Sequence, residues 1–181
     1  MKTKIILFDL IDKGKNKEDE EEFFYYQGII KEKSNHFESV FHINEVTEDS
    51  KKSIFNKLVS SLENIYENET MYLHFTGHGV VEQNGKKGIA FLMWKELEEA
   101  LIRLKNRNNL IVVNLMNTCE SITFQNFSGF DKLWCCKGKT KDFFSPFDIY
   151  DVKNFDFEEF KKIVSKQYGD NCSENYMEII K

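Results

Sequence analysis

Two residues of the chain have side chains that together can carry out nucleophilic catalysis. His78 follows the apolar segment 71–76, and Cys119 follows the apolar segment 110–116. A thiol attacks a carbonyl carbon as its thiolate, and a neighbouring imidazole can accept the thiol proton. The same imidazole can then protonate the departing amine. These two residue types therefore predict the hydrolysis of an amide through a covalent intermediate, provided that the fold brings them together.

The elements that must position them alternate along the chain. Near-continuous apolar runs and short β-rich segments predict strands over 4–10, 37–43, 71–76, 110–116 and 132–136. Apolar residues three or four positions apart predict one helix that Thr47 can cap and another that begins at Trp94, and the acid-first segment 18–33 suits a helix because carboxylates are favoured at a helix N-terminus. A further helix is expected over 155–168. This alternation indicates βαβ units and a parallel sheet, whose ligand site lies beyond the carboxyl ends of the strands. We expect one α/β domain over residues 1–181, with a mostly parallel central sheet and helices on both faces.

Both motifs resemble those of a known superfamily. Segment 72–79 resembles the strand-end His-Gly motif of caspases and metacaspases, and segment 114–121 resembles the nucleophile motif of the same superfamily, including its CHAT branch. The resemblance implies a caspase-like three-layer sandwich and a cysteine endopeptidase that forms a thioester acyl-enzyme, with His78 and Cys119 as its catalytic dyad. It also implies an oxyanion hole made by the backbone N–H groups of Gly79 and Cys119. Bacterial relatives of this kind often serve antiviral defence or cell death, so a similar role is expected.

Three residues are expected to line the pocket for the substrate side chain that precedes the cut. In the superfamily the residue two before the nucleophile, here Asn117, helps to line this pocket, and metacaspases carry Asp there. Asp9 and Asp12 end the first strand and face the same edge of the sheet. These carboxylates favour a basic or small polar residue before the cut. The alternative is that Asp12 only begins a surface loop.

Specificity for aspartate is disfavoured by the distribution of cations. Caspases bind the substrate carboxylate with arginines, whose planar guanidinium binds it bidentately. The chain has only two arginines, Arg103 and Arg107, and both precede the strand 110–116, at the opposite end of the sheet from the site. Unless Lys13 or Lys15 replaces them, an aspartate pocket has no cation.

Other chemistry is less well supported by the residues. His74 lies within the strand 71–76 and is predicted to be buried and hydrogen-bonded rather than catalytic. The four cysteines lack the paired spacing of a zinc site, and Cys135 and Cys136 are expected to face opposite sides of a strand. No glycine-rich phosphate loop follows the first strand, so a nucleotide-binding domain is a weak alternative. Neither a cofactor nor a metal is predicted.

Composition limits the partners. The formal charge is −5 without a basic stripe, which disfavours nucleic acid, and no apolar run approaches the ~18 residues of a membrane span. A cytoplasmic protein is expected, acting on a protein or peptide substrate and controlled by an activating partner chain. The competing prediction is a catalytically inactive module of the same fold that serves interaction or regulation, with the strand-end thiol retained for packing.

Overall fold

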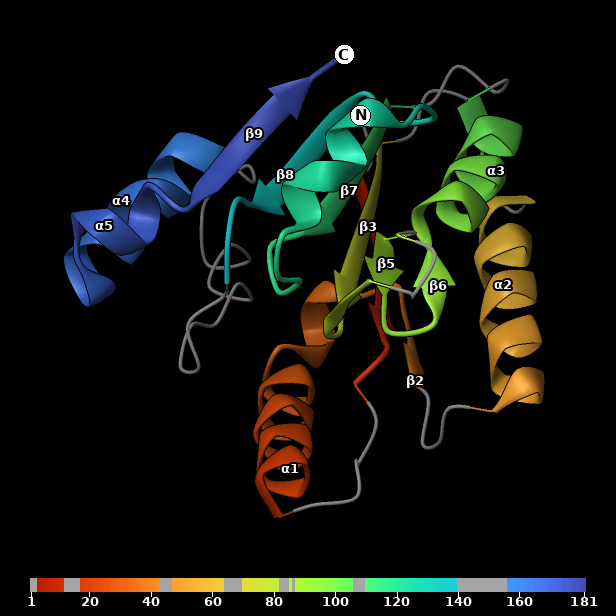
Figure 1. Ribbon diagram of the computed structural model, residues 1–181, viewed down its shortest axis with the longest axis horizontal. Coiled ribbons are helices and arrows are strands. Elements are labelled where there is room, and N and C mark those ends of the chain that lie inside the picture. The colour runs from red at the N-terminus through yellow and green to blue at the C-terminus, as the bar shows by residue number, and fades with distance from the viewer. Residues whose placement is uncertain are drawn as a thin grey trace.

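A six-stranded sheet forms the centre of the molecule. The computed structural model describes residues 3–11, 17–42, 47–63, 70–81, 85, 87–105, 110–139 and 156–181. The strand order is β2-β1-β3-β7-β8-β9, and every neighbouring pair is parallel except β8 and β9 (Figure 1). The strands are β1 (Thr3–Asp9), β2 (Ser39–His42), β3 (Thr70–Thr76), β7 (Leu110–Leu115), β8 (Lys132–Cys136) and β9 (Tyr176–Ile180).

Helices cover both faces of this sheet. The helices are α1 (Lys17–Glu32), α2 (Glu48–Glu63), α3 (Trp94–Lys105) and α4 (Phe157–Tyr168). Residues of α2 and α3 join one core cluster with Phe8 and Phe75, while residues of α1 and α4 join the opposite cluster with Leu7 and Tyr72 (Figure 1). Burial on both faces explains the near-continuous apolar runs of the central strands. The predicted α/β fold with a mostly parallel sheet between two helical layers is confirmed.

Local sequence signals account for the helix boundaries and for the two adjacent thiols. Asp156 begins α4 because its side chain accepts hydrogen bonds from the first-turn amides of Glu158 and Glu159 at 2.9 and 3.2 Å. Cys135 belongs to the core on the α2–α3 side and Cys136 to the core on the α1–α4 side, as predicted.

Among the described helices, none combines the length and the apolar character that a membrane crossing requires.

A second, smaller sheet lies between β3 and α3. It consists of three antiparallel strands, β4 (Gly79–Val81), β5 (Lys87–Ile89) and β6 (Leu92–Met93). The sequence did not predict it, nor did it predict β9 or the short helices η1 (Ser34–His36), η2 (Ser121–Asn126) and α5 (Asp170–Ser173). Because β4 begins immediately after His78, this small sheet fixes the path of the chain beyond the histidine.

Candidate active site

His78 is held at the carboxyl end of β3 by the small sheet. The chain leaves β3 through Gly77, whose φ is 155°. A Cβ at Gly77 would lie 3.1 Å from Ile89 Cγ1 and 3.2 Å from Leu10 Cβ, so the exit is narrow. The backbone carbonyl of His78 accepts a hydrogen bond of 2.7 Å from Ala90 N. The backbone is therefore fixed, while the imidazole remains 60% exposed.

Cys119 is presented by a tight turn after β7. The Ser121 hydroxyl donates to the Leu115 carbonyl at 2.8 Å and accepts from the backbone N–H of Cys136 at 2.9 Å, which ties the turn to β7 and β8. Glu120 adopts a left-handed conformation with a φ of 53°, which is uncommon outside glycine. Of the four cysteines, all within the described residues, Cys119 alone is not buried. The nucleophile predicted from the sequence is therefore the accessible thiol.

The segments that carry the histidine and the cysteine touch at Gly79. A Cβ on Gly79 would lie 2.3 Å from the Cys119 carbonyl oxygen and 3.4 Å from Cys119 Cβ. No side chain fits there, so only glycine allows this approach. The structure thus places Gly79, next to His78, against Cys119 at the shared edge of β3 and β7, where we expected the dyad and the oxyanion hole.

A groove of about 280 Å³ is lined in part by Cys119. Its lining comes from the small sheet, the start of α3 and the turns after β7 and β8: Gly79, Val80, Val81, Lys87, Gly88, Trp94, Cys119, Glu120, Thr123 and Lys139. Lys87 Nζ lies 3.5 Å from Glu120 Oε2, and Trp94 Nε1 donates to Thr123 Oγ1 at 2.9 Å. The sequence did not indicate this groove, because strands of two or three residues show no usable periodicity.

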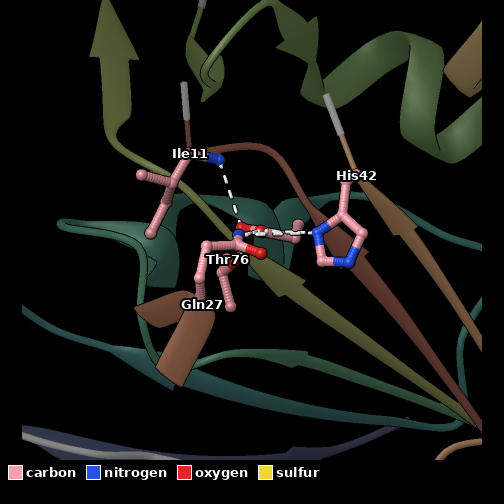
Figure 2. Close-up of polar contacts among 5 residues, drawn as sticks. Ile11, Gln27, His42 and Thr76 are labelled. Carbon is pink, nitrogen blue, oxygen red and sulfur yellow. Dashed lines mark hydrogen bonds and ion pairs between the residues drawn. The ribbon is translucent and has the colours of Figure 1, made fainter. Parts of the chain in front are cut away.

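Asp9 lies at the predicted sheet edge but is enclosed. It has no exposed surface, and its carboxylate accepts hydrogen bonds from Thr76 Oγ1 at 2.7 Å and Gln27 Nε2 at 2.5 Å. His42 Nδ1 lies 3.0 Å from the same carboxylate (Figure 2). These contacts contradict the prediction that Asp9 lines a substrate pocket, because its oxygens link strands and α1 within the chain. Asp12 lies outside the described residues.

Asn117 is also committed to partners within the chain. It is 8% exposed, its Oδ1 lies 2.9 Å from His74 Nε2, and its Nδ2 donates to the Tyr26 hydroxyl at 3.1 Å. The buried amide therefore joins β3, the turn after β7 and α1, and its prediction as a pocket residue is not supported by this placement.

His74 is buried and hydrogen-bonded, as predicted. Burial lowers the pKa of His74 to about 4, outweighing the opposite effects of the Asn117 hydrogen bond and the Asp9 charge. The ring is thus neutral near pH 7, and it donates its Nε2 proton to the Asn117 oxygen. His74 supports the turn that carries Cys119 without facing a substrate.

Of the four cations considered for an aspartate pocket, the structure describes only Arg103. Arg103 lies in the last turn of α3, which leads into the start of β7, away from the edge that carries Cys119. Arg107, Lys13 and Lys15 lie outside the described residues. Within the described ranges, no group of three or more His, Cys, Asp or Glu side chains could hold a metal ion.

Comparison with known proteins shows a likeness of fold. No protein-family model and no curated protein matches the chain. A solved structure, protein GSU0716 from Geobacter sulfurreducens, is similar with a TM-score of 0.57 at 11% identity, covering 100% of this chain and 93% of that one. The caspase drICE is similar with a TM-score of 0.49 at 9% identity, covering 99% of this chain and 87% of that one. A TM-score of 0.49 does not establish a shared fold, so this second likeness says nothing further about the chain.

Proposed function

We propose that this protein is a cysteine endopeptidase with Cys119 as its nucleophile and His78 as its proton carrier. The observation that supports the proposal is the close approach of Gly79, the residue after His78, to Cys119, whose thiol is the one of the four that is not buried. Both residues stand beyond the carboxyl ends of neighbouring parallel strands, where α/β sheets bind their ligands.

The reaction follows from the chemistry of these groups. His78 takes the thiol proton, and the Cys119 sulfur attacks the carbonyl carbon of the scissile amide. The backbone N–H groups of Gly79 and Cys119 donate to the oxyanion that develops, and each such donor is worth ~10²–10³ in rate. The C–N bond then breaks, His78 protonates the leaving amine, and a thioester remains on Cys119. Water, deprotonated by His78, hydrolyses the thioester and restores the thiol.

The substrates in this proposal are proteins or peptides that enter the groove beside Cys119. Lys87, Lys139 and Glu120 give the groove charges of both signs, and the exposed Val81 gives it an apolar surface. The proposed setting is a defence or cell-death response controlled by a partner chain, which rests on the resemblance of the two motifs.

A second candidate is the catalytically inactive module of the same fold. The burial of Asp9 and Asn117 favours it, because the polar groups expected to bind the substrate are used within the chain. The two candidates differ in the reactivity of Cys119, since an inactive module has no need of a thiolate.

A panel of peptidyl acyloxymethyl ketones distinguishes the two candidates. The thiolate of a cysteine peptidase displaces the acyloxy group of such a probe as a carboxylate and forms a stable thioether with the rest of the probe. The panel would carry Lys, Arg, Ala, Asn or Asp before the ketone, and mass spectrometry would locate the adduct. We expect labelling at Cys119 that is lost in His78→Ala and retained in the control His36→Ala, whose histidine lies on η1. If no probe labels wild type faster than His78→Ala, the inactive module is the better account.

A further inference from the structure

Helix α1 is fixed against the carboxyl ends of strands on both sides of His78. Gln27 Nε2 donates to Asp9 at the end of β1, and the Tyr26 hydroxyl accepts from Asn117 beyond β7. Tyr26 is buried with Ile30 in the core between α1 and the sheet. These contacts fix both the position of α1 and its rotation about its own axis.

One carboxylate of α1 reaches the histidine between these two anchors. Glu22 lies one turn before Tyr26, and residues four apart share a helix face. Its Oε2 lies 3.5 Å from His78 Nε2, and its side chain is 39% exposed. Since β3 lies between β1 and β7 in the sheet, α1 contacts the ends of three consecutive strands, and Glu22 supplies the contact to the middle one.

We infer that Glu22 is a positioning residue for His78, an inference that rests on the proposed function. Because the carboxylate lies 3.5 Å from Nε2, it favours the proton on that nitrogen, and Nδ1 is then the ring nitrogen that exchanges a proton with Cys119. This contact fixes the tautomer and the orientation of the ring, because the partner of one nitrogen determines the state of the other. When His78 takes the thiol proton, the carboxylate stabilises the imidazolium that forms.

The size of the effect follows from exposure. Both partners are partly exposed to water, so the pair behaves as a surface ion pair, which changes an equilibrium constant by up to about fivefold. Lys87 and Glu120, which also lie near Cys119, form an ion pair with each other, with 3.5 Å between Nζ and Oε2. The effect of Glu22 on His78 is therefore modest, and its loss should slow the reaction without abolishing it.

The first test observes the histidine ring itself and needs no substrate. In ¹⁵N-labelled protein, NMR detects which His78 nitrogen carries the proton and how the ring signals change with pH. Glu22→Gln should lower the ratio of the Nε2–H form to the Nδ1–H form of His78 by up to about fivefold. The matched control is Glu21→Gln, which removes the neighbouring carboxylate that pairs with Lys17 at 3.4 Å. The same tautomer ratio in Glu22→Gln and in the control would overturn the inference.

The second test connects the contact to the reaction. With the ketone probe that labels wild type fastest, Glu22→Gln should lower the labelling rate of Cys119 by up to about fivefold and change the shape of its pH profile. Glu22→Asp should recover part of the rate, and Glu21→Gln should match wild type. Labelling of Glu22→Gln at the wild-type rate across the pH range would overturn the role of Glu22 while leaving the proposed function intact. If wild type is not labelled, the proposed function fails, and the positioning role fails with it even if the tautomer ratio changes in Glu22→Gln.

Discussion

Replacing Gly79 by alanine should disable the site through a clash of known size. The added Cβ would lie 2.3 Å from the Cys119 carbonyl oxygen, so the two segments must separate by about 1 Å to reach ordinary contact. A shift of about 1 Å between reacting groups costs ~10²-fold in rate. We therefore expect the rate of Cys119 labelling by the peptidyl ketones to fall about 100-fold in Gly79→Ala. Forcing a group into a packed contact should also lower the free energy of unfolding by ~1–3 kcal/mol.

Gly28→Ala provides a matched control for this substitution. A Cβ on Gly28, within α1, meets no atom within 4 Å. Alanine in a helix is favoured over glycine by ~0.5–1 kcal/mol, so this variant should be as stable as wild type or slightly more so. Urea unfolding and the labelling rate would be measured for both variants. If Gly79→Ala stays folded and labels within about twofold of wild type, then the close approach of Gly79 to Cys119 does not support the reaction, and the reasoning is refuted.

Three further substitutions test the buried polar groups around the site. Because burial lowers the pKa of His74 to about 4, against about 6.5 in the unfolded chain, the unfolded chain binds the extra proton between these values and stability falls as the pH drops through them. In urea titrations, the free energy of unfolding of wild type should therefore fall by about 2 kcal/mol between pH 7 and pH 5 because of His74, and this loss should be absent from His74→Gln. The same pH dependence in wild type and His74→Gln would contradict the burial argument. Asp9→Asn should lower the free energy of unfolding by about 2–3 kcal/mol and leave the probe preference unchanged, whereas altered preference at wild-type stability would restore its pocket role. Ser121→Ala removes the hydroxyl between Leu115 and Cys136 and should cost about 1–3 kcal/mol together with slower labelling of Cys119, so wild-type stability and labelling would show that the turn does not depend on it.

The central sheet was predictable because its strands are buried on both faces. In β1, β3 and β7 such burial requires near-continuous apolar runs, and these can be read without knowing the partners. The small sheet gave no such signal, since its strands have two or three residues each and pair only through a local hairpin. The edge strand β9 is only partly buried and antiparallel, so it lacks the run that marks the others.

The sequence was sufficient to place the candidate site at the ends of two strands, but not to predict its polar surroundings. His78 and Cys119 could be placed at one edge because the carboxyl ends of parallel strands meet there. The packing of α1 decides which polar atoms at that edge are accessible to a substrate. No pattern in the sequence shows that Gln27 contacts Asp9 or that Tyr26 contacts Asn117. The same tertiary contacts explain why Glu22 could not be identified from its position in a charged helix.

Peptide cleavage by the purified chain tests the central claim most directly. Wild type, Cys119→Ala and His78→Ala would each be incubated with a proteome-derived peptide library, and new termini would be read by mass spectrometry. We predict new termini in wild type that share a preferred residue before the cut and that are missing from both variants. Cleavage that persists in Cys119→Ala, or a wild type that produces no more termini than the two variants, would contradict the assignment of a cysteine endopeptidase.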